Sequence, residues 1–450
     1  MINGLEVNER GHLQLGGCDT VELARRFGTP LYVLDESLIR QNCARYREAL
    51  AQCYPDSRVA YAGKAFMTSA ICRLVEEEGL SLDTVSGGEI YTALQTGFPA
   101  ERIIFHGNNK SEAEIDLALR AGVGRLVVDS FSELALLSRI AAARSLEANI
   151  YLRVNPAVAP TTHAYIQTGQ ADSKFGFGLD TQVQKAVARA VKLPGLNLRG
   201  LHCHIGSQIL SLAPFRRAAE VMVGLMAKIR REQGLTLAEL DLGGGLGIRY
   251  RREDSPPAIE DYVRALTGTV KAEAARYGLP LPRLLIEPGR SIVGPAGTTL
   301  FQVGCCKVVP GVRKYVAVDG GMMSDPRPAL YGARYTFVVA NRALEPARKL
   351  VTIAGKACES GDILIRDVEL PALRRGDILA MLATGAYHHS LASNYNHFAR
   401  PAAVFVNAGR AELVVARENY ADLVRRDFIP PHMLRKAAQG EPAAPTPTDH

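Results

Sequence analysis

Long apolar runs are absent from this sequence. No stretch approaches the roughly 20 apolar residues that a membrane-spanning helix needs, and residues 1–10 lack the apolar core of a signal peptide. No dense basic run and no nucleic-acid-binding motif is present, although 53 Lys and Arg against 46 Asp and Glu leave a net charge of +7. These absences predict a cytoplasmic protein that binds neither nucleic acid nor a membrane.

Cysteine pairs of the CxxC kind are also absent. The eight cysteines are spread along the chain, and since no signal peptide indicates an oxidising compartment, we expect reduced thiols. Most of them should be small buried hydrophobic residues. Cys358 differs because it lies between polar residues on a predicted turn, where a thiol is more able to react.

The size and composition of the chain indicate a folded protein with more than one core. Its 450 residues are too many for one ordinary core and suit a large barrel with a companion domain. A hydrophobic content of 47% with 22% charged residues is typical of globular proteins.

One pattern recurs between Arg58 and Arg290. A short β-branched run ends in polar or Gly residues, and an amphipathic helical stretch such as 69–78, 112–121 or 131–143 follows. Roughly eight such repeats are expected of a (β/α)8 barrel, although a doubly wound open sheet has similar units. The runs that predict strands are residues 58–62, 81–85, 102–105, 125–129, 149–154, 198–203, 239–242 and 283–286.

The residues that follow these strands favour the barrel. Polar and Gly residues come after most of them, whereas an open sheet would concentrate such residues at a single switch point. In a barrel the carboxyl ends of the strands form the mouth that carries the chemistry. The residues are Lys64, Ser86, His106, Asn108, Asn155, His204, Gly243, Gly244, Gly245 and Glu287.

Beyond Ser291 the pattern changes to short strands with little helix between them. We predict strands at 299–303, 315–318, 335–339, 350–353, 377–381 and 402–406, which indicate an all-β, sandwich or Greek-key-like domain. The strand-like residues 13–15 suggest that the N-terminal strand joins it. The expected divisions are an N-terminal segment 1–30, a barrel 31–290, a β-domain 291–435 and a disordered tail 436–450 rich in Ala and Pro.

Lys64 ends the first predicted strand in the motif Tyr61-Ala-Gly-Lys64-Ala. A lysine confined at the end of an apolar strand is partly desolvated, which lowers its pKa and provides the neutral amine that a carbonyl cofactor requires. A lone lysine is more often a surface residue whose ammonium reaches water, so the motif alone is weak.

Two motifs at the last two predicted strands suit a phosphorylated cofactor. The glycines of Asp241-Leu-Gly-Gly-Gly-Leu-Gly247 allow backbone N–H groups to approach an anion, although a tight turn is the simpler interpretation. Glu287, in Glu287-Pro288-Gly289-Arg290, has the chemistry to keep a pyridine nitrogen protonated, and Arg290 to bind a phosphate or carboxylate. An internal Glu–Arg ion pair is the alternative.

His202 and His204 lie two residues apart and face the same side of a strand, which is compatible with metal binding. No third ligand is indicated by spacing, so we predict no metal site. The alternatives are a ring stacked on a planar cofactor, with Ser207 donating to a phosphate, or a buried structural histidine.

Three motifs of the predicted β-domain carry further candidate residues. In Asp319-Gly-Gly-Met-Met-Ser-Asp-Pro-Arg327-Pro-Ala-Leu-Tyr331, prolines on both sides of Arg327 restrict a loop and suit a carboxylate clamp. Ala357-Cys358-Glu359-Ser-Gly-Asp362 and Thr384-Gly-Ala-Tyr387 follow. Each of these motifs alone is only a turn.

Together, in this order and spacing, the motifs resemble the fold-type III pyridoxal-phosphate-dependent decarboxylases, and among them those that act on meso-diaminopimelate. The resemblance extends from about Gly28 to Arg400. It also includes His106-Gly-Asn-Asn-Lys110 and His204-Ile-Gly-Ser-Gln208, which look like barrel-mouth loops of the family.

The resemblance implies a role for each candidate residue. Lys64 would bind the pyridoxal 5'-phosphate, His204 would stack on its ring and Glu287 would hold its pyridine nitrogen. Cys358 would return a proton after carbon dioxide leaves, and Glu359 would bind the distal ammonium of the substrate. Both residues would come from the partner subunit of a homodimer. The phosphate would be surrounded by Ser207, Gly243, Gly244, Gly245, Glu287, Pro288, Gly289, Arg290 and Tyr387, and the distal carboxylate of the substrate by Arg290, Arg327, Tyr331 and Tyr387.

The resemblance implies decarboxylation of meso-2,6-diaminopimelate to L-lysine. Relatives that act on ornithine, arginine or lysine are alternatives, but those substrates end in a cation, which Arg290 and Arg327 would bind poorly. A racemase would need a second base on the opposite face of the ring. A barrel-only pyridoxal-phosphate carrier would need neither the β-domain nor Cys358.

Overall fold

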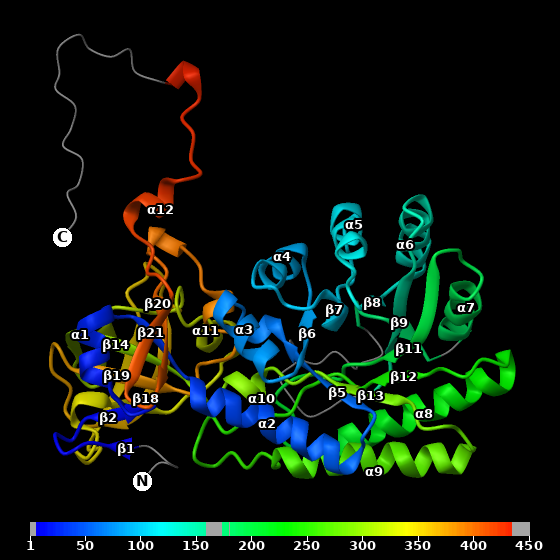
Figure 1. Ribbon diagram of the computed structural model, residues 1–450. Helices are drawn as coiled ribbons and strands as arrows, with labels where there is room; N and C mark the ends of the chain where they lie inside the picture. The colour runs from blue at the N-terminus through cyan, green and yellow to red at the C-terminus, as the bar shows by residue number, and fades with distance from the viewer. Residues whose placement is uncertain (1–5, 159–172, 180, 434–450) are drawn as a thin grey trace.

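The computed structural model describes residues 6–158, 173–179 and 181–433. Figure 1 shows two parts, a barrel with helices around it and a β-domain beside it. Among the described residues, no helix combines the length and the apolar character needed to cross a membrane. The predicted disordered tail, 436–450, lies outside the described residues.

Eight parallel strands of the described chain close into a barrel, as predicted. The circle is complete because β13 pairs with β5, where Ile286 is the register partner of Val59, and β8 pairs with β9. A short strand, β10 (Phe177–Gly178), pairs in parallel with the end of β9. The barrel strands are β5 (Ser57–Ala62), β6 (Ser81–Thr84), β7 (Ile103–Phe105), β8 (Arg125–Val128), β9 (Ala148–Asn155), β11 (Leu196–His202), β12 (Glu239–Asp241) and β13 (Arg283–Ile286).

Helices surround the barrel, and polar residues after the strands start several of them. The side chain of Ser86 accepts a hydrogen bond from the backbone N–H of Glu89, and Ser130 caps the next helix but one in the same way. Such caps satisfy backbone donors at a helix start. Ser86, expected at the mouth, is therefore an N-cap. The helices are α2 (Glu36–Cys53), α3 (Ser69–Glu77), α4 (Gly87–Gln95), α5 (Glu112–Ala121), α6 (Phe131–Ala143), α7 (Thr181–Ala190), α8 (Ala213–Gln233) and α9 (Ile259–Tyr277).

The β-domain is built on a mixed sheet, in agreement with the predicted all-β domain. The sheet has the order β18-β17-β15-β14-β4-β20-β21, and β19 pairs with both β14 and β16. All six strands predicted from 299 onward are present. Five agree with their predicted limits to within two residues, whereas β14 continues six residues beyond its predicted end. The sheet strands are β4 (Leu31–Asp35), β14 (Gly297–Val309), β15 (Arg313–Val318), β16 (Phe337–Val339), β17 (Lys349–Ala354), β18 (Ile363–Leu370), β19 (Ile378–Leu382), β20 (Ala402–Asn407) and β21 (Arg410–Val415).

Strand β4 corrects the predicted domain limit at residue 31. It pairs antiparallel with β14 and parallel with β20, so it is a strand of the β-domain sheet and not of the barrel. Its residues Leu31 and Val33 are fully buried in a core shared with Val404. The apolar run was compatible with either part, because strand pairing and not local sequence decides which sheet a strand joins.

The N-terminal segment packs on the β-domain. Strands β1 (Glu6–Val7), β2 (Leu13–Leu15) and β3 (Cys18–Asp19) form a small sheet of their own, followed by α1 (Thr20–Phe27). Leu13 of β2 is fully buried among residues of the β-domain core. The segment therefore joins the domain through side-chain packing rather than by adding to the large sheet.

The base of the barrel, at the amino ends of its strands, carries a buried ion cluster. Glu239, which begins β12, accepts hydrogen bonds from Arg125 at 2.8 and 2.7 Å and from the hydroxyl of Tyr151. Arg283 and Arg199 lie 3.7 and 3.6 Å away. Burial raises the pKa of Glu239, but the opposite effect of Arg125 and Tyr151 is larger in total, so the pKa falls to about 2.

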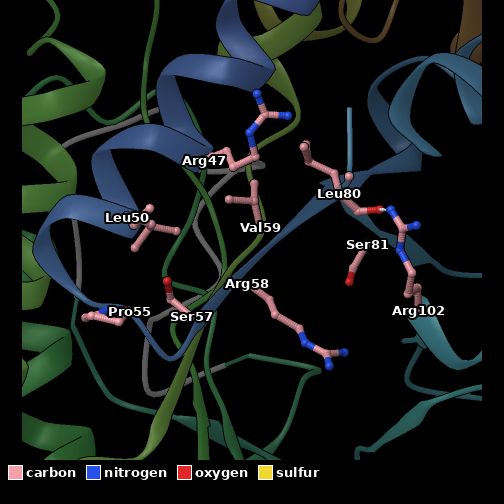
Figure 2. A pocket seen from close by; sticks show the side chains of 11 residues that line it. Arg47, Leu50, Pro55, Ser57, Arg58, Val59, Leu80, Ser81 and Arg102 are labelled. Atoms are coloured by element: carbon pink, nitrogen blue, oxygen red, sulfur yellow. Dashed lines mark hydrogen bonds between the residues drawn. The ribbon is translucent and has the colours of Figure 1, made fainter. Parts of the chain in front are cut away.

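A cavity of about 380 Å³ opens near this cluster. Figure 2 shows that Arg47, Arg58 and Arg102 project around it, beside the start of β5. Lys64 follows the other end of β5. The cavity therefore lies at the opposite end of the barrel from the candidate cofactor lysine.

Candidate active site

Lys64 lies directly after β5 in a short turn, η1 (Gly63–Ala65), and points toward β6. Its Nζ is 3.1 Å from Oδ2 of Asp83, a buried carboxylate within that strand. Burial lowers the pKa of Lys64, but the negative charges around it, Asp83 above all, raise the pKa above its ordinary value. The predicted lowered pKa is therefore wrong for this structure, because Asp83 stabilises the ammonium.

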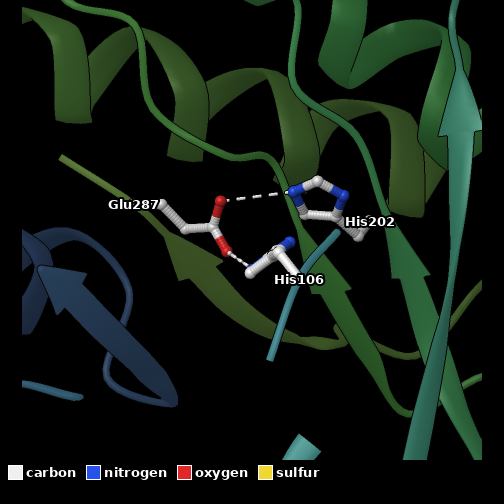
Figure 3. A group of neighbouring side chains, drawn as sticks. All are labelled: His106, His202 and Glu287. Atoms are coloured by element: carbon white, nitrogen blue, oxygen red, sulfur yellow. Dashed lines mark hydrogen bonds and ion pairs between the residues drawn. The ribbon is translucent and has the colours of Figure 1, made fainter. Parts of the chain in front are cut away.

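Glu287, which follows β13, is held between two histidines (Figure 3). Its Oε1 lies 2.6 Å from Nε2 of His106 and its Oε2 3.2 Å from Nε2 of His202. All three side chains are buried. Burial raises the pKa of Glu287, but the histidines hold it well below its usual range, so the carboxylate stays ionised. Burial lowers the pKa of His202 to about 3, so that ring is neutral.

This cluster brings to His202 two candidate ligands, His106 and Glu287, that spacing did not indicate. One donor atom from each of His106, His202 and Glu287 lies within 4.8 Å of the others, a grouping that could hold a metal ion. The group includes His202 but not His204, so it is not the histidine pair that the sequence suggested. Spacing could not reveal the group because the three residues follow or end three different strands, β7, β11 and β13.

A second carboxyl group lies beside Glu287. Burial, and then the charge of Glu287, raise the pKa of Asp241 well above its usual range. Two buried carboxylates close together cannot both ionise easily, so Asp241 carries the proton and Glu287 the charge. This division keeps a single anion at Glu287.

The glycine loop after β12 approaches its neighbours too closely for any side chain. A Cβ on Gly244 would lie 2.1 Å from the carbonyl oxygen of Glu287, and a Cβ on Gly245 2.3 Å from that of Gly206. Gly245 also has a φ of +116°, which favours glycine. The backbone N–H of Gly244 donates to Nδ1 of His204 at 3.2 Å. The absence of side chains therefore lets the loop backbone pack against Glu287, Gly206 and His204, and backbone N–H groups of such a glycine loop can bind an anion.

Arg290 and Arg327 are buried cations. Each side chain belongs to a residue that is 4% exposed, and neither forms an ion pair with any carboxylate among the described residues. Arg290 donates to Oγ of Ser207 from Nε and Nη2, at 3.1 and 2.8 Å. Buried charges without a partner are costly, so this pair indicates an anionic ligand.

Tyrosines surround the two guanidinium groups. Arg290 donates to the hydroxyl of Tyr250, and Arg327 donates to the same oxygen at 3.0 Å. Arg327 also donates to the hydroxyl of Tyr335. The Arg290 guanidinium lies 4.8 Å from the ring centre of Tyr387.

The structure places the predicted substrate residues Tyr331 and Tyr387 near these arginines. The ring centre of Tyr331 is 5.8 Å from the Arg327 guanidinium. Both Arg327 and Tyr331 belong to a short helix, α11 (Arg327–Tyr331), and not to the loop that we expected, because proline at the first positions of a helix is well tolerated. Tyr387 has a φ of +68°, and its N–H donates to the carbonyl of Ala65 at 2.8 Å, which ties it to the Lys64 turn.

Cys358 and Glu359 stand apart from the rest of the candidate site. Both are exposed on the turn between β17 and β18. The N–H of Cys358 donates to Oδ1 of Asn396 at 2.8 Å, and Asp362 closes the turn by accepting from the N–H of Ala357 at 2.8 Å. Within the described chain, no hydrogen bond or ion pair joins Cys358 or Glu359 to Lys64, Arg290 or Arg327.

The sequence prediction missed Asp83 and Tyr250. Asp83 could have been found because it is an acidic residue inside an apolar strand. A carboxylate is rarely buried in such a strand unless it has a partner. Tyr250 follows the glycine loop by a few residues, and nothing in its local sequence distinguishes it from other tyrosines.

The arrangement fits pyridoxal 5'-phosphate. An amine at Lys64, an ionised Glu287 and a side-chain-free loop at Gly244 and Gly245 match a carbonyl carbon, a pyridine nitrogen and a phosphate. Glu287 stays charged despite burial, which is what a protonated ring nitrogen requires. The residues present therefore fit the cofactor group by group.

Comparisons with known proteins give the same result. Residues 36–294 match the family model described as "Pyridoxal-dependent decarboxylase, pyridoxal binding domain". The chain is 51% identical to the diaminopimelate decarboxylase of Bacillus subtilis (strain 168) over 422 residues, 94% of this chain and 96% of that protein. The crystal structure of diaminopimelate decarboxylase from M. jannaschii with L-lysine has a TM-score of 0.90 at 38% identity, with 96% of this chain and 99% of that chain covered.

A second solved structure extends the agreement. The diaminopimelate decarboxylase of Helicobacter pylori with L-lysine has a TM-score of 0.83 at 33% identity, with 90% of this chain and 98% of that chain covered. The likeness thus includes both the barrel and the β-domain. The chain belongs to the family of pyridoxal-dependent decarboxylases, and its cofactor is pyridoxal 5'-phosphate.

Proposed function

We propose that this protein removes one carboxylate of meso-2,6-diaminopimelate as carbon dioxide and releases L-lysine, the final step of lysine biosynthesis. The observation that carries the proposal is the pair of buried arginines, Arg290 and Arg327, which have no carboxylate partner among the described residues. A substrate with a second carboxylate satisfies both cations. The relatives of this chain that carry the name diaminopimelate decarboxylase support the same substrate.

The cofactor would be held by residues of the barrel mouth. Lys64 would bind its carbonyl carbon and His204 would pack on its ring. The phosphate would lie against Ser207, the glycine loop Gly243, Gly244 and Gly245, the turn Glu287, Pro288, Gly289 and Arg290, and Tyr387. When bound, pyridoxal phosphate accepts the electron pair that the departing carboxylate leaves behind.

Glu287 and Lys64 would divide the proton chemistry. Glu287, ionised between His106 and His202, would keep a proton on the pyridine nitrogen. Lys64 would have to lose its proton before it reacts, and Asp83, 3.1 Å from Nζ, is the group placed to hold the ammonium until then. Each role depends on a carboxylate held in a fixed position, that of Glu287 or that of Asp83, and neither requires the backbone to move.

Selection among amino acids would occur at the distal end of the substrate. Arg290, Arg327, Tyr331 and Tyr387 would surround the second carboxylate, and Glu359 would bind the second ammonium. A substrate that ends in a cation alone would leave the Arg327 guanidinium buried and unpaired, which costs a few kcal/mol and disfavours ornithine, arginine and lysine.

Cys358 would return the proton to the α-carbon, and it would do so from a second copy of the chain. Its turn is exposed and makes no described contact with Lys64 of its own chain, so a role in the reaction requires a homodimer that brings the turn of one protomer to the mouth of the other. Glu359 would arrive on the same turn. The exposure of both residues supports this arrangement.

Two other activities on a similar scaffold fit the residues less well. A racemase would need a second base on the ring face opposite Lys64, and Cys358 with Glu359 suits a decarboxylase instead. A protein that only carries the cofactor would not need two buried arginines, Arg290 and Arg327, that lack a carboxylate partner.

The experiment is product analysis with purified protein, pyridoxal phosphate and meso-diaminopimelate. Equal amounts of carbon dioxide and L-lysine are expected from the wild type. Racemised diaminopimelate without carbon dioxide would replace the proposal with the racemase, and no change in the substrate would favour the carrier.

A further inference from the structure

Tyr250 joins the two arginines of the site through a single oxygen. Its hydroxyl oxygen accepts one N–H from Nη1 of Arg290 and one from Nη1 of Arg327, the latter at 3.0 Å. Arg290 begins α10 (Arg290–Val293) at the mouth of the barrel, and Arg327 begins α11 in the β-domain. Tyr250 therefore fixes the relative position of two guanidiniums from different parts of the molecule.

The backbone and ring of Tyr250 are themselves held on three sides. Its N–H donates to Oδ2 of Asp254 at 3.0 Å. Its carbonyl oxygen accepts from Oγ1 of Thr336 at 2.9 Å. Its ring meets that of Tyr335 edge-on, with centres 4.9 Å apart. These contacts restrict the position of the phenol oxygen on which both arginines converge.

The proton of this hydroxyl has no acceptor among the described residues. The oxygen accepts from two cations, and no hydrogen bond donated by Tyr250 Oη is present in the described chain. A phenol can donate one hydrogen bond while it accepts others. Beside two guanidiniums, this donor is available to an anion that both arginines bind.

We propose that Tyr250 is the third member of the distal-carboxylate clamp: its oxygen aligns Arg290 and Arg327, and its hydroxyl donates to the carboxylate that both bind. This inference rests on the proposed function, since it takes the ligand of the arginines to be the second carboxylate of a diamino dicarboxylic acid. Tyr250 contributes specificity because a substrate ending in an ammonium offers its hydroxyl no acceptor.

The clamp couples ligand binding to a proton. Burial raises the pKa of Tyr250, but the opposite effect of Arg290 and Arg327 is larger in total, so the pKa lies below its ordinary value. Tyr335 packs edge-on against the ring of Tyr250, whereas Asp254 meets the backbone N–H of Tyr250 and not its phenol. A bound carboxylate adds negative charge and requires the hydroxyl form, so its binding raises the pKa of Tyr250. Above the pKa of the free enzyme, binding therefore takes up a proton, and affinity falls as the pH rises.

The test uses holoenzyme and pimelate, a dicarboxylate of the same chain length as diaminopimelate but without its amines. Calorimetry should show that Tyr250→Phe weakens pimelate binding by about tenfold to a hundredfold, as expected for a lost hydrogen bond to a charged group. KM for diaminopimelate should rise by a similar factor with kcat nearly unchanged. The matched control is Tyr54→Phe, which removes another buried hydroxyl, one that donates to Pro282 at 2.6 Å far from the site.

Equal or tighter binding in Tyr250→Phe would overturn the proposal, because the phenol would then merely occupy the place of the ligand. A second measurement needs no variant. Calorimetry of the wild type at alkaline pH, in buffers of different ionisation enthalpy, should show up to one proton taken up per pimelate bound, and at neutral pH much less. No pH-dependent proton uptake would contradict the inference even if Tyr250→Phe failed to fold.

The two failures can be told apart. If the wild type released no carbon dioxide from diaminopimelate yet bound pimelate with this proton uptake, the proposed function would fall and the clamp would remain. If carbon dioxide were released but Tyr250→Phe bound pimelate as tightly as the wild type, only the inference about Tyr250 would be contradicted.

Discussion

The two ends of the barrel differ in whether their buried charged side chains have partners of opposite charge. At the base, Glu239 is surrounded by Arg125, Arg199 and Arg283, so its charge is more than matched within the chain. At the mouth, Arg290 and Arg327 are equally buried but have only hydroxyl groups as described partners. We infer that the ions at the base serve stability, whereas Arg290 and Arg327 serve ligand binding, since barrels in general place catalysis at the carboxyl ends of their strands.

A cation left without a carboxylate costs folding free energy unless a ligand binds it. Substitutions at the mouth should therefore reduce activity with little loss of stability, and substitutions at the base should do the reverse.

Lys64→Ala should lower kcat by about a thousandfold or more, because no other described amine lies beside Asp83. The visible absorbance of the lysine-bound cofactor should disappear after dialysis. The melting temperature of the cofactor-free proteins should differ little. A variant that kept the absorbance band and turned over substrate would contradict the role of Lys64.

Cys358→Ala should lower kcat by about a hundredfold, the usual contribution of a positioned general acid. The residue is exposed, so cofactor content and stability should not change. Mixing this variant with inactive Lys64→Ala should restore activity if the turn acts across a dimer, since one site of the mixed dimer is then complete. Absence of rescue, with mixed dimers confirmed by mass, would refute the shared site.

Arg327→Met should raise KM for meso-diaminopimelate by roughly thirtyfold to a hundredfold. Because the change removes a buried cation with no carboxylate partner, the free energy of unfolding of the ligand-free protein should stay the same or increase. Urea unfolding measures this directly. A clear loss of stability would show that Arg327 is a structural ion.

Glu239→Gln, at the base, should lower the free energy of unfolding by about 2–3 kcal/mol, because Arg125 loses its charged partner. KM and kcat should remain those of the wild type. A drop in kcat/KM larger than about threefold in a folded variant would break the proposed division between base and mouth.

The stabilising effect of Glu239 should depend on pH. The pKa of Glu239 is lowered in the folded protein, to about 2 from an ordinary 4.5. Such a group contributes stability above the unfolded pKa, and the contribution is lost as the pH falls through the folded pKa. The stability difference between wild type and Glu239→Gln should thus be constant near neutral pH and shrink between about 4.5 and 2. A difference that grew on acidification would contradict the assignment.

Local sequence was sufficient for the barrel but not for the edges of the β-domain. The eight barrel strands are buried on both faces and read as short apolar runs. By contrast, β18 (Ile363–Leu370) and β21 (Arg410–Val415) are the outer strands of their sheet, and their charged residues concealed them. A strand exposed on one side carries polar residues that a search for apolar runs passes over.

The candidate site was predictable where one segment carries the chemistry. Lys64, Glu287 and the glycine loop stand at strand ends, which the sequence marks. The partners of these residues were not predictable, because Asp83 reaches Lys64, and His106 reaches Glu287, from other strands. The sign of the Lys64 pKa shift depends on such a partner, which is why burial alone predicted the wrong direction.

The most direct test of the account is the substrate preference of the wild-type holoenzyme. Carbon dioxide release should be measured with meso-diaminopimelate, ornithine, arginine and lysine under identical conditions. We predict kcat/KM for diaminopimelate at least about a hundredfold above that of the others, since only diaminopimelate pairs Arg290 and Arg327 with a carboxylate. Comparable or faster release from a basic amino acid would contradict the claim that the unpaired charges at the mouth select the substrate.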